Sequence, residues 1–191
     1  MQMSLRQMLL RSGFVRREDG VVAIEAMVMM PLMFLTFMAL FVTFDAYRQY
    51  AVHQKAAYVV SDMISRETMP INSAYIDETH QIFDTLTQRE QNSSIRVTVV
   101  RFDAAANEMV LEWSEIRGGL SDRDDASVND WTVLLPRMVN GEEMIVVETW
   151  ARYTPPFRAG IRSQEITNFI FTRPRYAPQI DFDDGAGGLN S

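Results

Sequence analysis

The chain has 191 residues, a formal net charge of −7 and no cysteine, which excludes disulfides and thiolate metal sites. Removing residues 1–20, which carry four Arg against one Glu and one Asp, would leave a charge of −9. This acidic balance offers no basic surface for nucleic acid, and we expect no nucleic-acid partner. The length allows one domain of ordinary size with an appendage.

A long apolar run lies near the N-terminus. Ala26 to Phe44 form 19 residues without a charge, and Thr36 and Thr43 are its only polar side chains. At about 1.5 Å per residue this run covers roughly 28 Å, close to the ~30 Å hydrocarbon thickness of a bilayer. We predict a single transmembrane helix over residues 21–44.

The charges on either side of the run predict its orientation. Residues 1–20 form a short leader with four arginines, whereas the first charge after the run is Asp45. By the positive-inside rule, the N-terminus stays in the cytoplasm and the chain from residue 45 onward is exported. A single pass through the inner membrane with a periplasmic domain over residues 45–176 is the resulting expectation.

The leader offers one place for proteolytic cleavage. The run is longer than the apolar core of a secretory signal, and the segment after it, "VTFDAYRQY", has no good small-x-small site. The remaining site lies before the run, between Gly20 and Val21.

The stretch "DGVVAIEAMVMMPLMFLTFMALFVTF" resembles the TadE-like minor pseudopilins of the tight adherence (Tad/Flp) pilus, in the TadE/TadF/TadG group. The shared features are a basic leader, Gly20, Glu25 at the fifth position of the mature chain, and Pro31 six residues later. The major Flp pilins have tyrosine after this glutamate, whereas this chain has Ala26 and a long exported part, which favours a minor component. The resemblance implies cleavage after Gly20 by a prepilin peptidase at the inner membrane. It also implies three kinds of assembly partner: related minor pseudopilins, the Flp pilin and the inner-membrane platform.

Glu25 has two physical interpretations. An ionised carboxylate inside a membrane is costly, so the side chain could extend to the headgroups and remain incidental. Alternatively, cleavage after Gly20 gives Val21 a free α-ammonium four residues away, and the two charges pair within one subunit or between neighbours. Pro31 removes one helical hydrogen bond, and either an ordinary bend or a packing role follows from it.

The sequence of the part expected to be exported predicts two helices and four strands. We expect the first helix to continue from about residue 22 to 66, because a stripe of Val52, Ala56, Val59, Val60 and Met63 follows the apolar run. A second helix is expected over residues 73–89. Alternating apolar residues predict a strand in "SIRVTVVRFD". Further strands are expected in "MVLEWSEI", "EMIVVETWARYT" and "EITNFIFTR". The expected fold is α+β and pilin-like, with the second helix on a small antiparallel sheet, and a disordered tail over residues 177–191.

Two groups of side chains are weak candidates for a metal. Asp77, His80 and Asp84 can share one helical face, but a solvated polar face is favoured because there is no second histidine nearby. Asp122, Asp124 and Asp130 could offer oxygens to Ca²⁺. Their loop fails the EF-hand pattern, since Ser127 replaces the required glycine and Val133 the terminal glutamate. We expect no cofactor, and no catalytic motif is present.

Three functions remain open at this stage. The first is a non-enzymatic minor pseudopilin that helps to initiate, prime or cap a Tad pilus, either staying in the membrane or entering the fibre. The second is an uncleaved, membrane-tethered periplasmic domain that binds a ligand. The third is a type II secretion pseudopilin, which Val21 and the position of Pro31 disfavour.

Overall fold

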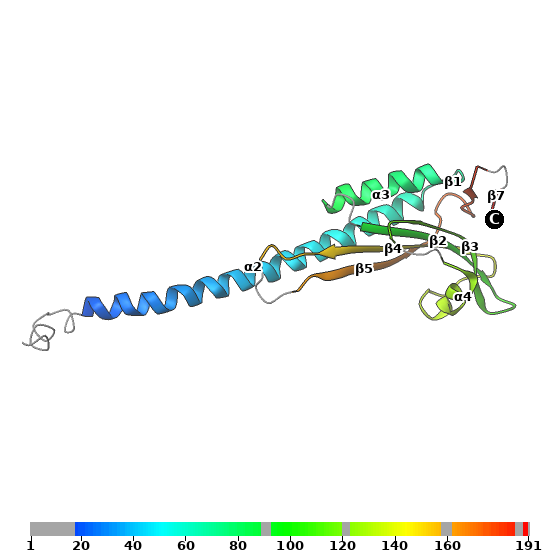
Figure 1. Cartoon of the computed structure of the whole chain (residues 1–191). Helices are drawn as coiled ribbons and strands as arrows, with labels where there is room; N and C mark the ends of the chain where they lie inside the picture. Colours follow the sequence, from blue (N-terminus) through cyan, green and yellow to red (C-terminus); the bar gives the residue numbers. More distant parts are fainter. Residues whose placement is uncertain (1–17, 89–92, 120–122, 158–161, 186–188, 191) are drawn as a thin grey trace, which may run out of the picture. The chain divides into compact units, whose positions relative to one another are not determined.

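The computed structural model describes residues 18–88, 93–119, 123–157, 162–185 and 189–190, without the side chains of residues 18–21, 125, 130, 189 and 190. The fold is α+β, with a long N-terminal apolar helix and a small antiparallel sheet (Figure 1). The chain divides into two compact units. One contains residues 1–45 with 156–161, and the other contains residues 46–155 with 162–191.

Helix α2 (Glu18–Ile64) is continuous through Pro31. From Val22 to Phe37 the described side chains are exposed on every side of the helix. Within the described residues, this helix is the one long and apolar enough to cross a membrane. The predicted helix over residues 22–66 is therefore confirmed to within a few residues at each end.

The C-terminal part of α2 has a different pattern of burial. Ala56, Ala57, Val60 and Ile64 are buried in one cluster with side chains of the sheet. The two alanines carry small side chains, which allow the sheet to approach the helix closely. This segment confirms the predicted amphipathic stripe only in part. Ala56 and Val60 are buried, Val52 and Met63 are partly buried, and Val59 is 50% exposed.

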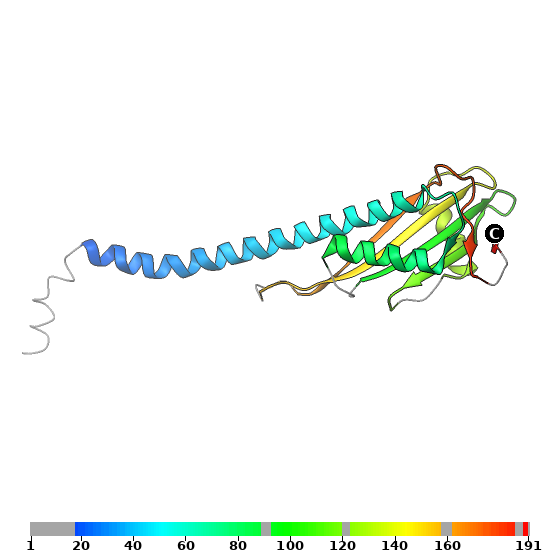
Figure 2. The ribbon, with the colours of Figure 1, turned by 90° about the horizontal axis from the view of Figure 1, so that it is seen from above.

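Helix α3 (Ser73–Thr87) packs on the same face of the sheet (Figure 2). Asn72 caps its first turn by accepting a hydrogen bond from the backbone N–H of Tyr75, at 2.9 Å. The helix ends at Gln88, whose left-handed backbone conformation directs its N–H to the last carbonyls. Phe83 is fully buried and lies 6.0 Å from His53 of α2, measured between ring centroids.

The main sheet contains the four predicted strands in the order β3-β2-β4-β5, all antiparallel. The strands are β2 (Ser93–Asp103), β3 (Glu108–Arg117), β4 (Glu143–Tyr153) and β5 (Gln164–Thr172). A bulge interrupts the β2–β3 register between Val99 and Val100. It moves Trp113 to the helix-covered core and Met109 to the opposite face, although both have odd numbers on one strand.

The second face of the sheet carries a smaller core. Two short helices cover part of it, α4 (Asp125–Val128) and the 3₁₀-helix η2 (Asn129–Val133). Trp131 and Leu135 pack there with Val100, Met144 and Val146. The sheet is therefore buried on one face and partly buried on the other.

The expectation of a disordered tail from residue 177 differs from the structure. Residues Phe182–Asp183 form β6, which pairs in parallel with β1 (Ile71–Asn72) and antiparallel with β7 (Leu189–Asn190). Ile180 and Phe182 are buried in the main core. The physical reason is that these two apolar side chains, spaced two apart in an extended segment, close the end of the core beside Trp113.

Candidate functional site

The membrane-type segment at the start of α2 holds the residues of the expected processing site. The backbone of Gly20 and Val21 is helical, and Glu25 lies one turn later on the same helix. The Glu25 side chain is exposed, as are its neighbours Val22 and Ile24. Among the described residues, the Glu25 side chain forms no hydrogen bond or ion pair. Its carboxylate is thus available to a group outside the described chain.

The polar groups of the apolar run are satisfied within the helix. The hydroxyl of Thr36 donates to the carbonyl oxygen of Leu32, and that of Thr43 to the carbonyl oxygen of Ala39, each at 2.9 Å. Lipid acyl chains offer no hydrogen-bond partner to a hydroxyl, so a hydroxyl on a membrane-spanning helix must bond to a carbonyl oxygen of its own helix. Pro31 lies inside the helix without ending it. Between Val22 and Phe44 the sequence has one ionisable residue, Glu25.

The loop that held the weak candidates for a Ca²⁺ site is described only in part. Asp124 accepts a hydrogen bond from the backbone N–H of Ser127 at 3.0 Å, and Ser127 Oγ donates to the carbonyl oxygen of Asp124 at 2.7 Å. Asp124 is therefore a helix-capping residue at the start of α4. Asp122 lies outside the described residues, and so does the side chain of Asp130. Within the described part of the chain, no group of three or more His, Asp or Glu side chains is arranged to hold a metal ion.

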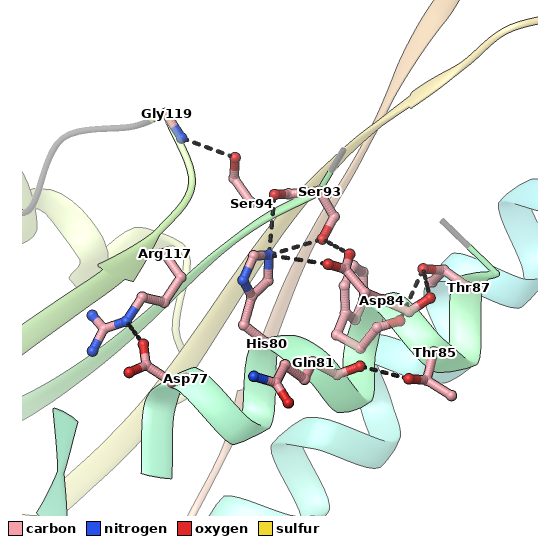
Figure 3. A network of polar contacts seen from close by, with 11 residues as sticks. Asp77, His80, Gln81, Asp84, Thr85, Thr87, Ser93, Ser94, Arg117 and Gly119 are labelled. Atoms are coloured by element: carbon pink, nitrogen blue, oxygen red, sulfur yellow. Dashed lines mark hydrogen bonds and ion pairs between the residues drawn. The ribbon is translucent and has the colours of Figure 1, made fainter. Parts of the chain in front are cut away.

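The polar residues of α3 form a network with β2 rather than a solvated face (Figure 3). His80 Nε2 lies 3.1 Å from both the carbonyl oxygen and Oγ of Ser93, and Ser93 Oγ donates to Asp84. The side chains of His80 and Asp84 are mostly buried. The prediction of a solvated face is wrong for these two residues, because the first residue of β2 lies against α3 and supplies polar partners.

The three residue types of this network are those of a hydrolytic triad, but their geometry differs. In a triad, one ring nitrogen of the histidine faces the serine and the other faces the acid. Here Nε2 faces both, at 3.1 Å from Ser93 Oγ and 3.8 Å from Asp84. Ser93 is also buried and already bonded to Asp84. The network fastens α3 to β2, and its arrangement is structural.

Arg117 makes a second connection between α3 and the sheet. Its guanidinium donates to Asp77, to Glu115 at 3.0 Å, and to the carbonyl oxygen of Ser73 at 2.9 Å. Burial opposes the charged form, but the hydrogen bonds to Asp77 and Glu115 outweigh it and raise the pKa of Arg117. The arginine therefore stays charged and fixes the first turn of α3 to the end of β3.

Sequence reasoning missed a buried ionic cluster on the second face of the sheet. Arg96 and Glu148 stand directly opposite each other on β2 and β4, with Nε and Oε2 separated by 2.7 Å. Arg123 reaches the same carboxylate at 2.8 Å. Burial tends to raise the pKa of Glu148, but the bonds from both arginines outweigh it and lower that pKa. The one available signal was a single charge within the most apolar part of each strand, Arg96 in "IRVTVV" and Glu148 in "MIVVETW".

The other buried glutamate of β4 lies on the opposite face. Glu143 accepts a hydrogen bond from the backbone N–H of Ile180 at 3.0 Å and is almost fully buried. Its burial raises the pKa of Glu143, partly offset by that hydrogen bond. Trp113 adds a second polar contact to the same segment, since its indole Nε1 donates to the carbonyl oxygen of Ile180 at 2.6 Å.

The unit of residues 46–155 with 162–191 also has a groove of about 310 Å³. It is lined by Ala46 and Tyr50 of α2, Tyr153 at the end of β4, and the first residues of β5, Gln164–Thr167.

Comparison of the chain with protein-family models, with curated proteins and with solved structures gave no match.

Proposed function

We propose that this protein is a structural minor pseudopilin that helps to initiate, prime or cap a Tad/Flp-type pilus, and that a prepilin peptidase cuts it between Gly20 and Val21. The observation that carries the proposal is one continuous helix that holds Gly20, Glu25 and Pro31 in the pseudopilin spacing. It then presents apolar side chains on all sides. The partners are the peptidase, related minor pseudopilins, the Flp pilin and the inner-membrane platform. The N-terminus lies in the cytoplasm and the folded domain in the periplasm.

The chemistry of the proposal is a charge pair that proteolysis creates. Val21 and Glu25 are four residues apart, about one helical turn, so the new α-ammonium and the carboxylate lie on one side of the helix. In a low-dielectric environment two opposite charges are tolerable when they meet, within one subunit or between neighbours. Pairing between subunits would set the axial stagger of helices in an assembly. The function needs no active site.

Processing is tested by intact-mass measurement of the protein extracted from membranes, with and without the prepilin peptidase. The expected product has lost its first 20 residues when the peptidase is present. Gly20→Val is expected to stay full-length, because the peptidase must bind the backbone at a residue without a side chain. Gly13→Val, a matched glycine substitution within the leader, is expected to be cut normally. A product beginning at Met1 in cells that assemble pili would refute the proposal.

The groove beside Tyr50 and Tyr153 favours a second candidate, an uncleaved membrane-tethered domain that binds a small ligand. Its volume lies at the lower end of the range for small-molecule sites, roughly 300–1,000 Å³. This candidate requires no processing and gives Glu25 no role. The same mass measurement separates the two, because the leader would then remain attached to the working protein.

A further inference from the structure

The unit that contains the N-terminal half of α2 also contains residues 156–161 of the β4–β5 connection. The described part of this stretch, Pro156 and Phe157 (hereafter the tip), begins three residues after β4 ends at Tyr153. The ring of Phe157 packs against the ring of Phe41, with centroids 6.3 Å apart and planes tilted by 54°. A loop residue of the sheet connection is therefore in contact with the apolar run.

The position of Phe41 fixes the depth of this contact. Phe41 belongs to the uncharged run and lies three residues before its last member, Phe44. On a helix this is about 4.5 Å, less than one turn. If the run spans a bilayer, a side chain packed on Phe41 lies at the boundary between acyl chains and headgroups rather than in water.

The exposure of the side chains at this level shows that α2 is covered on one side only. Val42 is fully buried, whereas Phe41 is 45% exposed and Phe44 is 71% exposed. Phe157 itself is 49% exposed. About half of its ring thus remains for an apolar environment outside the chain, next to helix residues that require the same environment.

The local sequence suits a fixed contact. Pro155 and Pro156 come directly before Phe157, and their locked φ angles restrict the conformations of the connection. Phe is among the residues whose transfer into a membrane is favourable. We infer that Phe157 is a membrane anchor: the β4–β5 tip inserts this ring into the lipid interface beside Phe41, with acyl chains covering its exposed half. The inference rests on the membrane span of the proposed function but not on cleavage after Gly20.

The experiment uses site-directed spin labels on the full-length chain, which has no native cysteine to remove. The protein is reconstituted in vesicles of phosphatidylethanolamine and phosphatidylglycerol. Collision rates of the label are measured with oxygen, which concentrates in lipid, and with a water-soluble nickel chelate. Pro156→Cys reports the tip, Leu40→Cys reports the span, and Val139→Cys reports an exposed loop of the folded unit.

The label at position 156 is expected to resemble the label at position 40, with a nickel collision rate several-fold lower than at position 139. Adding Phe157→Ser is expected to raise that rate several-fold. Phe171→Ser, which removes a comparably exposed ring from β5, is expected to leave it unchanged. This matched pair separates the loss of one anchor from a general loss of aromatic surface.

Four outcomes would overturn the inference. A label at 156 that meets nickel as freely as the label at 139, while position 40 is protected, leaves the span in place and the tip in water. A label protected from both reagents indicates a protein contact instead of lipid. A label in lipid that ignores Phe157→Ser shows that Phe157 is not the anchor. A label at position 40 that is open to nickel removes the span itself, and with it the membrane location in the proposed function.

Discussion

The C-terminal segment gives the sharpest test of the fold, through the substitution Phe182→Ala. Phe182 is 6% exposed, and its ring centroid lies 5.3 Å from that of Trp113. Removing a buried phenylalanine side chain costs about 3–5 kcal/mol of unfolding free energy, from lost burial and the cavity left behind. The segment lies at the end of the core and is held by a two-residue parallel pairing with β1, so it can partly relax. We therefore expect a loss of about 3 kcal/mol, a large share of a typical total of about 5–15 kcal/mol.

The assay is urea unfolding of the full-length protein in detergent micelles, followed by tryptophan fluorescence. Trp113 is a suitable reporter because its indole also bonds to Ile180 in the same segment. Gln179→Ala is the matched control, three residues earlier and exposed. The control is expected to stay within about 0.5 kcal/mol of the wild type, as surface substitutions usually do. If Phe182→Ala unfolds at the same urea concentration as the wild type, the segment does not contribute to the core and the reasoning fails.

Three further predictions concern carboxylates. Glu148→Gln is expected to cost about 3–5 kcal/mol at neutral pH, because the buried Arg96 and the partly buried Arg123 both lose the opposite charge of Glu148. The lowered pKa of Glu148 adds stability that is present above the ordinary carboxyl pKa and lost as the pH falls through its native value, so the variant's acid unfolding curve should be flatter. Glu143→Gln should be neutral or stabilising at pH 7, since the amide oxygen still accepts from Ile180. The raised pKa of Glu143 has the opposite effect on the pH dependence of stability: its contribution is lost as the pH rises through the pKa of Glu143 in the folded protein. Urea midpoints measured over a range of pH would detect this loss. Glu25→Ala should abolish pilus assembly without changing the urea midpoint, and normal piliation on electron micrographs would make Glu25 incidental.

The elements that the sequence predicts well are those with long, regular patterns. The apolar run and the stripe after it predict α2, and apolar-rich segments of eight or more residues predict the four strands of the main sheet. These patterns show whether one face or every face of an element is apolar. That property can be read from residues that are close together in the sequence. Element ends and the order β3-β2-β4-β5 follow from contacts between distant segments, which no local pattern encodes.

The sequence pattern does not predict the ordered tail or the buried charges, for a related reason. Between Asp and Gly residues, Ile180 and Phe182 are only two apolar positions, and their partner strand β1 has two residues about a hundred positions earlier. Composition alone therefore favoured disorder. Glu148 and Arg96 are each ordinary polar positions on a strand, and only the register of β2 with β4 makes them a buried pair. In the candidate processing segment, the sequence and the helix supply Gly20, Glu25 and Pro31, but no contact within the described chain tests their roles.

The two candidate functions differ in the electrostatics of one residue. A helix that exposes apolar side chains on all sides must find its apolar environment outside the chain, in lipid or among other helices. In that environment Glu25 needs a positive partner or a path to water. In the uncut chain the nearest basic residue before it is Arg17, eight positions away, whereas cleavage places an amine at Val21, about 6 Å along the helix. The attraction between two charges increases as their separation falls and as the dielectric constant falls. Under the proposed function, proteolysis would therefore supply Glu25 with a partner at the point where an ionised carboxylate is hardest to keep.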